Sequence, residues 1–304
     1  MLSGMQKFKQ LLEYFRWKSK YKRIVNKYPV KVLNFEDSLN KIINERCSVS
    51  RYGDGEFRMM LLGDHGKTFE INSKRLAIEL RKVISMNRSN LLVCLPNVYT
   101  GMSDMKFTAK VIWIGEVGRL LPEYYPYLNV NYNYGDAFIT RPYHDYTFDN
   151  RVIKQRFNMV KKLWNQRPVL IVEGRLTRFG MGNDLLDNAG KVSRILCPEI
   201  NAFERFDAIY SVVTEYIDNT GEKDLLVMLA LGPTATVMAA KISQELDVQA
   251  VDIGHLDIEY EWFKRHTSEK VQIEGKYVNE AAGAKYIEGK VDSDYSKSIY
   301  SSIV

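Results

Sequence analysis

The feature that most constrains the fold of this chain is a regular alternation of short apolar runs with amphipathic stretches. The strongest apolar run, 225–231, leads directly into Gly232-Pro233-Thr234 and a helical pattern over 235–246. Further strand-like runs lie at 48–51, 91–95, 169–172, 192–196 and 248–253, and further helical patterns lie at 34–44, 109–121 and 203–217. Strands separated by helices are typical of a mostly parallel sheet with helices on both faces. The sequence therefore predicts an α/β fold.

Composition agrees with a cytoplasmic globular protein. The 304 residues are 45% hydrophobic and 26% charged, which supplies enough apolar mass for a core. No apolar run approaches the roughly 20 residues that span a bilayer, and the N-terminus lacks the apolar stretch of a signal peptide. Cys47, Cys94 and Cys197 are widely spaced and form no metal-binding pair, so we expect reduced thiols.

The positive charge is concentrated in residues 1–31. The whole chain carries +6, but this segment holds nine Lys/Arg and one acid, Glu13, for a net +8, which leaves −2 on the remainder. A nucleic-acid enzyme would more often carry its basic patch across the folded domain. We therefore expect no nucleic-acid partner.

The same segment is predicted to be a helix, because Phe8, Leu11, Leu12 and Phe15 repeat at helical spacing. Two interpretations stay open. The helix is either an interfacial helix on an anionic membrane surface, or a solvated basic helix whose apolar stripe packs on its own domain or on another subunit of a homo-oligomer. We divide the chain into a basic amphipathic arm (1–31), a main domain (32–280) and a polar C-terminal tail (281–304).

Two carboxylates follow the first predicted strand. Asp54 and Glu56 stand two residues apart, so in an extended stretch both project to the same side. Two hard oxygen donors are what Mn²⁺ or Mg²⁺ takes when it also bridges a diphosphate, and Arg51 stands where it could neutralise phosphate. The alternative is an acidic glycine turn between strand and helix.

Three further segments are candidates for ligand contacts. Gly232-Pro233-Thr234 joins a strand to a helix, which places backbone N–H groups and the positive end of a helix dipole at the carboxyl edge of the sheet. Arg175 and Arg178 stand in a Gly-rich loop after another strand and suit a pyrophosphate. Asp136 lies in a polar-aromatic loop, 134–143, which could stack on a base or a sugar. The alternative for each is a structural turn or loop.

The densest titratable cluster is 252–262, after the last strong strand. His255 could ligate a metal, bind phosphate or act as an acid or base. Asp257, Glu259 and Glu261 follow, and an extended backbone would put Glu259 and Glu261 on one face with aromatic side chains on the other. An exposed acidic loop is the alternative. Acids for a metal, arginines for phosphate and aromatics for flat groups together indicate a nucleotide-diphosphate substrate.

Five motifs in this order resemble the GT-D type glycosyltransferases, a bacterial family known from glycosylation of streptococcal surface adhesins. They are Arg51-Tyr52-Gly53-Asp54-Gly55-Glu56, Gly135-Asp136-Ala137-Phe138, Gly180-Met181-Gly182-Asn183-Asp184, Leu231-Gly232-Pro233-Thr234-Ala235-Thr236 and Asp252-Ile253-Gly254-His255-Leu256-Asp257-Ile258-Glu259-Tyr260-Glu261-Trp262. The similarity runs from about residue 35 to 280 and includes 275–280. It implies a Rossmann-like sheet, a UDP-sugar donor and a divalent metal, Mn²⁺ or Mg²⁺.

The resemblance also implies site residues. The family's metal motif matches Asp54 and Glu56, its functional His and Glu match His255 and Glu261, and its loop arginine matches Arg175 or Arg178.

We therefore expect a metal-dependent transferase that moves a hexose from a UDP-sugar to a bacterial surface glycan, on a protein or a lipid carrier. Glu261 is the predicted base, with Glu259 or Asp257 as alternatives. A nucleotide-sugar phosphohydrolase and a membrane-recruited scaffold are the competing hypotheses.

Overall fold

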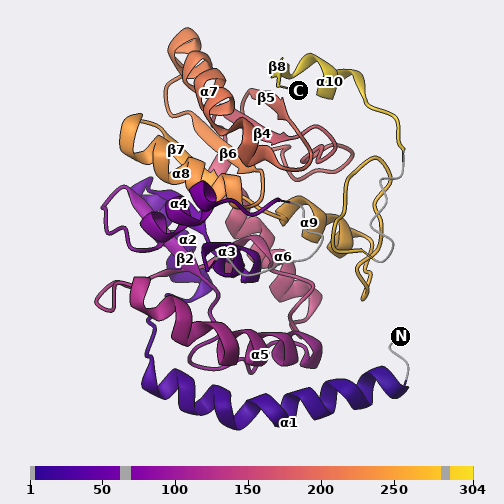
Figure 1. The fold of residues 1–304 in the computed structure, drawn as a ribbon. Helices are drawn as coiled ribbons and strands as arrows, with labels where there is room; N and C mark the ends of the chain where they lie inside the picture. The colour runs from indigo at the N-terminus through magenta and orange to yellow at the C-terminus, as the bar shows by residue number, and fades with distance from the viewer. Residues whose placement is uncertain (1–3, 62–69, 282–287, 304) are drawn as a thin grey trace.

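The centre of the molecule is one parallel sheet. A computed structural model describes residues 4–61, 70–281 and 288–303. Within these residues the sheet has eight strands in the order β3-β2-β1-β7-β6-β4-β5-β8, and every neighbouring pair is parallel (Figure 1). The strands are β1 Ser48–Arg51, β2 Leu91–Leu95, β3 Gly135–Asp136, β4 Val169–Gly174, β5 Val192–Cys197, β6 Leu226–Ala230, β7 Gln249–Asp252 and β8 Ile299–Ser302.

Helices cover both faces of this sheet, which confirms the predicted fold class. The helices are α1 Gly4–Lys27, α2 Phe35–Glu45, α3 Asp54–Met60, α4 Lys74–Ile84, α5 Phe107–Tyr124, α6 Asn150–Lys161, α7 Phe206–Thr220, α8 Pro233–Glu245, α9 Leu256–Lys264 and α10 Ser293–Lys297. Buried residues of α4, α5, α7 and α8 share one core, and those of α2 and α6, with Leu256 and Tyr260 of α9, share the other.

The strands divide their side chains between these two cores. In β2, Val93 and Leu95 belong to the first core, whereas Leu92 and Cys94 belong to the second. Successive side chains of a strand point to opposite faces, so a strand between two helical layers must be apolar at nearly every position. This burial explains why the sheet strands appear in the sequence as continuous apolar runs.

α5 runs further than the sequence pattern indicates, and a strand that the pattern does not predict, β8, lies in the polar tail. α5 passes through Pro122 and ends at Tyr124, whereas the pattern predicts an end before the proline. Pro122 removes one backbone donor in the last turn, and the chain continues into a 3-10 turn at Tyr125–Tyr127. At the other end of the chain, β8 pairs with β5 and forms an edge of the sheet.

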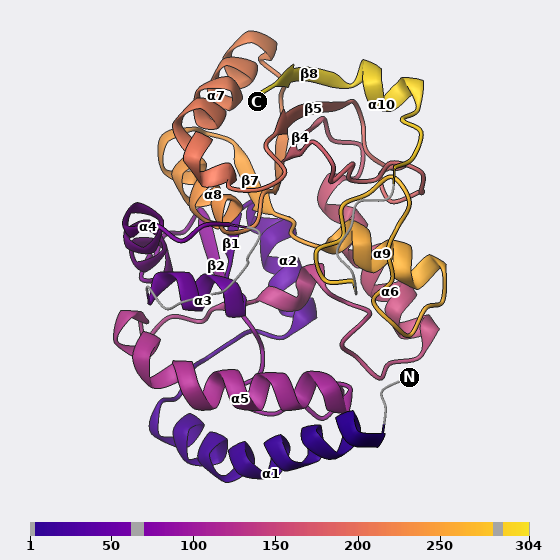
Figure 2. The same cartoon turned by 45° about the vertical axis from the view of Figure 1, so that its right-hand side comes forward.

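The predicted N-terminal helix is present and lies along α5 at the periphery of the molecule (Figures 1 and 2). Tyr21 and Ile24 are buried on this side, and Trp17 packs so closely against Gly118 that a Cβ there would overlap the indole. The predicted apolar stripe does not face α5. It is exposed, with Phe8 at 61%, Leu11 at 42%, Leu12 at 54% and Phe15 at 63%.

The interpretation that this stripe packs on its own domain is therefore wrong, because the helix uses its opposite face for that purpose. Over the described part of the chain, no helix combines the length and apolarity needed to cross a bilayer.

Cys47, Cys94 and Cys197 are buried and unpaired, and burial raises the pKa of each thiol.

The order of the strands predicts a ligand-binding position at the centre of the sheet. β1 and β7 are neighbours, paired in parallel at Val49 and Val251. The chain leaves β1 toward β2 on one side, and it leaves β7 through α9 toward β8 at the other edge. Ligands of open α/β sheets bind beyond the carboxyl ends of strands that diverge in this way. The ends of β1 and β7 are therefore the expected position of a site.

Candidate active site

A buried ion pair joins the ends of β1 and β7. Nη2 of Arg51 lies 2.8 Å from Oδ1 of Asp252, and its Nε donates to the Asp252 carbonyl at 2.9 Å. The hydroxyl of Thr236, in the first turn of α8, donates to the Arg51 carbonyl at 2.8 Å. Three of the predicted motifs thus meet at one point of the carboxyl edge. The ion pair holds Arg51 in a fixed orientation.

Gly254 and His255 complete this junction. Gly254 has a φ of +48°, and a Cβ at this position would overlap the Arg51 guanidinium, so the close approach requires glycine. His255 follows at the start of α9, and burial lowers its pKa to about 4. The imidazole is therefore neutral at physiological pH. The charges of Arg141 and Arg51 contribute to this shift of the pKa.

An anionic partner for His255 comes from a distant segment. Oε1 of Glu280 lies 3.4 Å from Nε2 of His255. Arg141 binds the same carboxylate with both Nη atoms, at 2.6 and 2.9 Å, and Lys270 also pairs with it. These cations hold the pKa of Glu280 well below its usual range. The sequence analysis does not single out Glu280 or Arg141, although both lie in segments that it quotes.

Asp54 and Glu56 lie in the first turn of α3, not in an extended stretch. Two residues apart on a helix, they project about 200° from each other around the axis, so the prediction that both point to the same side is wrong. The helix begins there because Gly53 is extended and the Glu56 carboxylate accepts the Gly53 N–H at 2.7 Å. Burial, and then the charge of Asp252, raise the pKa of Glu56 to about 7. Asp54 is exposed. The two carboxylates therefore differ in environment, and Glu56 is the one whose pKa is affected by the charges of Asp252 and Arg51.

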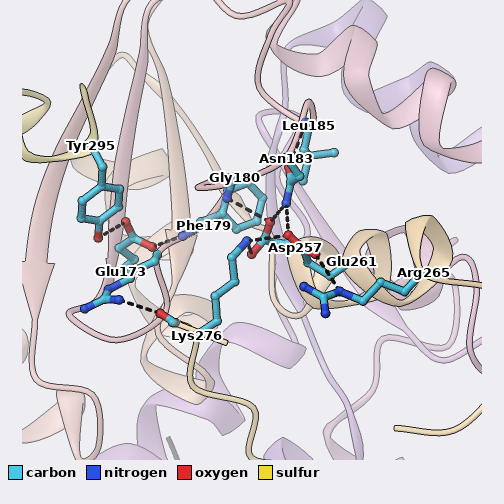
Figure 3. A network of polar contacts seen from close by, with 12 residues as sticks. Glu173, Phe179, Gly180, Asn183, Leu185, Asp257, Glu261, Arg265, Lys276 and Tyr295 are labelled. Atoms are coloured by element: carbon cyan, nitrogen blue, oxygen red, sulfur yellow. Dashed lines mark hydrogen bonds and ion pairs between the residues drawn. The ribbon is translucent and has the colours of Figure 1, made fainter. Parts of the chain in front are cut away.

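The acidic cluster after β7 is helical as well. The expectation of one acidic face and one aromatic face does not hold, because α9 turns residues 257 and 261 to the same side. Nζ of Lys276 lies 2.6 Å from Asp257 and 3.2 Å from Glu261 (Figure 3). The three side chains are 2%, 3% and 8% exposed, so this is a buried network.

The Gly-rich loop closes the network from the other side. The Gly180 N–H donates to Asp257 at 3.0 Å, and the Asn183 amide donates to Asp257 at 2.9 Å and to Glu261 at 2.7 Å (Figure 3). The sequence analysis misses Lys276. The one available signal is the i, i+4 spacing of Asp257 and Glu261, which calls for a cation once that segment is read as a helix.

Glu259 points away from this network. Its Oε2 accepts the N–H groups of Tyr143 and His144, at 3.0 and 2.8 Å. Burial raises its pKa to about 7. The three acids of α9 thus have two different environments, two of them paired with Lys276 and one bound by backbone N–H groups.

The remaining predicted contacts lie apart from the β1–β7 junction or serve the fold. Arg175 is exposed and pairs with Glu199 at 2.6 Å. Arg178 is buried and donates to the Gly275 carbonyl at 2.9 Å, which ties the Gly-rich loop to the segment that carries Lys276. Asp136 is buried and accepts the Phe138 N–H at 2.8 Å.

The 232–234 turn forms the start of α8, as predicted. Gly232 adopts a φ of +55° and Pro233 occupies the first helical position, which is where a proline fits a helix. The hydroxyl of Thr234 donates to the buried carboxylate of Glu70 at 3.2 Å. The turn follows β6 at the carboxyl edge of the sheet, and β7 lies between β6 and the strand of Arg51.

A second buried network supports the Gly-rich loop and was not predicted. Glu173, at the end of β4, pairs with Arg194 of β5 at 2.6 Å. Its carboxylate also accepts the Phe179 N–H at 2.6 Å (Figure 3). The Tyr295 hydroxyl of α10 donates to the same carboxylate at 3.1 Å. The loop 178–183 is thus held at both ends, by Glu173 and by Asp257.

Known proteins share this arrangement. A family model described as glycosyltransferase GT-D fold matches residues 49–281. The probable glycosyl transferase Gly of Streptococcus gordonii is 34% identical over 275 residues, which cover 90% of this chain and 39% of the relative. The glycosyltransferase GlyD of Streptococcus pneumoniae serotype 4 is 32% identical over 276 residues, 90% of this chain and 33% of the relative. The chain thus spans only a part of either relative.

Solved structures agree over nearly the whole chain. One, described as the highly conserved domain of unknown function 1792 with a distinct glycosyltransferase fold, has a TM-score of 0.86 at 32% identity and covers 95% of this chain and 100% of that one. A glycosyltransferase of the same domain type from Streptococcus sanguinis has a TM-score of 0.83 at 34% identity, with 90% and 100% covered. Sheet, motif order and family match agree, and the chain belongs to the glycosyltransferase GT-D fold family.

Proposed function

We propose that this chain transfers a hexose from a UDP-sugar to a hydroxyl of a growing surface glycan, carried by a protein or a lipid. The observation that carries the proposal is the junction of Arg51, Asp252 and His255 at the diverging ends of β1 and β7. The names of the relatives support glycosyl transfer. A diphosphate at this junction would meet the Arg51 guanidinium and the start of α8, both of which favour anions.

Asp54 and Glu56 are the candidate donors for a divalent cation that is shared with the substrate. Among the residues that the structure describes, no three His, Cys, Asp or Glu side chains form a preformed metal cage. Mg²⁺ and Mn²⁺ are commonly held by one or two carboxylates together with substrate phosphates, and Asp54 and Glu56 supply two. The repulsion between Glu56 and Asp252 marks a place where a cation would be stabilised. When bound, such an ion stabilises the departing diphosphate.

The proton of the acceptor hydroxyl needs a base. We propose Glu261, with Asp257 and Glu259 as alternatives. Oε1 of Glu261 is held by Asn183 and Lys276, whereas Oε2 has a longer contact, 3.4 Å, with the exposed Arg265. Oε2 is therefore the oxygen that would accept the proton. Glu261→Gln would keep these contacts and remove the basicity, so it should slow transfer while UDP still binds.

The test compares UDP binding and sugar transfer with and without Mn²⁺, over a panel of UDP-sugars. Asp54→Ala should abolish metal-dependent UDP binding and transfer, and leave the melting temperature nearly unchanged because Asp54 is exposed. Asp294→Ala is the matched control, an exposed acid in the first turn of α10. Full activity of Asp54→Ala would refute the metal assignment.

The same experiment separates the competing functions. Release of free sugar without transfer to an acceptor would indicate a phosphohydrolase, which needs the same metal and phosphate groups. Absence of any metal-dependent UDP binding would indicate a scaffold.

A further inference from the structure

The exposed face of α1 combines apolar and basic side chains in an arrangement that nothing else in the described chain covers. Phe8, Leu12 and Phe15 lie within about 60° of one another around the helix axis, and all three are more than half exposed. Met5 and Leu11 flank them and are also exposed. These five residues, the outer stripe, lie on the side opposite Tyr21 and Ile24, which face α5.

Basic residues surround the outer stripe. Lys9 and Arg16 lie beside it, and Lys22 and Arg23 continue the same side toward the C-terminal end of the helix; all four are exposed. Long basic side chains can lay their methylenes along an apolar surface and keep the charge in water. An apolar stripe bordered by Lys and Arg is typical of a helix that lies in the plane of a membrane surface.

We propose that α1 docks this domain flat on an anionic lipid bilayer through the outer stripe and its basic border. Charge indicates which partner this surface binds. Residues 1–31 carry +8 and the rest of the chain −2, so a bilayer rich in acidic lipids complements this segment. A second copy of the chain would bring the same positive segment against itself, which disfavours a symmetric dimer through this face.

The helix is attached to the domain firmly enough for such docking to orient it. The Tyr21 hydroxyl donates to the Val98 carbonyl at 2.5 Å, and Trp17 packs against Gly118 of α5. The outer surface of α1 is far from β8 and α10, which lie at the opposite end of the molecule (Figures 1 and 2). α1 would thus contact the membrane surface over a length of about 36 Å, at 1.5 Å per residue. This role does not depend on the reaction that the domain catalyses.

The test is co-sedimentation of the full chain with vesicles of phosphatidylcholine and phosphatidylglycerol, compared with pure phosphatidylcholine. Wild-type protein should bind the anionic vesicles, and binding should weaken as salt rises. Phe8→Ser with Leu12→Ser should reduce the partition coefficient at least about tenfold, because two side chains no longer leave water. The control is Ile78→Ser with Ile200→Ser, a pair that is 48% and 47% exposed on other elements and should leave binding unchanged.

Charge removal tests the choice of lipid. Each basic residue near an anionic surface contributes about fivefold to binding, so Lys22→Gln with Arg23→Gln should weaken binding about 25-fold at low salt. Phe8→Trp should show a blue-shifted emission on anionic vesicles, because the indole enters the interface. Circular dichroism and melting curves verify that each variant is folded.

Four results would overturn the proposal. Wild-type protein could stay in the supernatant with anionic vesicles, or bind neutral vesicles equally well. The serine double variant could sediment like wild type. A concentration-dependent dimer in sedimentation velocity, lost in that variant and accompanied by no vesicle binding, would assign the outer stripe to a second copy of the chain instead.

Discussion

Lys276 should be among the side chains on which the stability of this fold depends most. It is 2% exposed and lies 2.6 Å from Asp257 and 3.2 Å from Glu261, which are themselves buried. Lys276→Met keeps most of the aliphatic stem and removes the charge, so two carboxylates would be left buried without their cation. Breaking a buried ion pair from one side costs about 3–5 kcal/mol. We expect a loss of that size in the free energy of unfolding, measured by urea denaturation at pH 7.

Two comparisons make this prediction specific. Lys297→Met removes a lysine that is 76% exposed and paired only with an exposed acid, so it should change the unfolding free energy by less than about 0.5 kcal/mol. Adding Asp257→Asn and Glu261→Gln to Lys276→Met should recover most of the loss, because no uncompensated charge remains. A loss below about 1 kcal/mol for Lys276→Met, or no recovery in the triple variant, would refute the argument.

Two further predictions concern Asp136 and Gly254. Burial raises the pKa of Asp136 from 3.8 to about 7, so its contribution to stability is fully present below about pH 4 and is lost as pH rises through 7. The wild-type free energy of unfolding should therefore fall by about 2–3 kcal/mol more than that of Asp136→Asn between pH 5 and pH 8, measured by urea denaturation. An identical pH profile of the two proteins would contradict the assignment. Gly254→Ala should cost about 2 kcal/mol or more and weaken UDP binding in calorimetry, because its Cβ would displace Arg51 from Asp252; wild-type values for both would contradict the close contact.

Six of the eight strands that the structure describes could be predicted from the sequence, whereas β3, β8 and the conformation of the acidic segments could not. Burial on both faces forces a strand to be apolar throughout, and this signal is local. The acids at 257, 259 and 261 fit a period of two, which indicates a strand, but 257 and 261 also fit a helical turn. What decides between them is Lys276, fifteen residues further on, which binds the two acids of the helical pair. The spacing of the two acids allows for such a cation, but it does not indicate which residue supplies it.

The N-terminal helix poses the same problem in another form. Its sequence contains two apolar stripes, the outer stripe around Phe8 and a second one that includes Trp17, Tyr21 and Ile24. Both have helical spacing, so periodicity predicts the helix correctly and leaves open which face packs. The second stripe is the one that packs against the domain, because the Tyr21 hydroxyl donates to the backbone carbonyl of Val98 and because Gly118 leaves room for the indole of Trp17.

The fold holds the guanidinium of Arg51 in a fixed orientation. This group has five N–H donors, and the contacts to Asp252 and to the Ala137 carbonyl use three of them, from Nε, Nη1 and Nη2. The partners come from β7 and from the segment after β3, so they fix the plane of the group from two directions. Nη2 lies beside Gly254, where any larger residue would push it away. An arginine held in this way is already oriented when an anion arrives, so binding costs little side-chain entropy. A fixed cation at the edge of the sheet therefore results from three features together: Gly254, the buried Asp252 and the parallel pairing of β1 with β7.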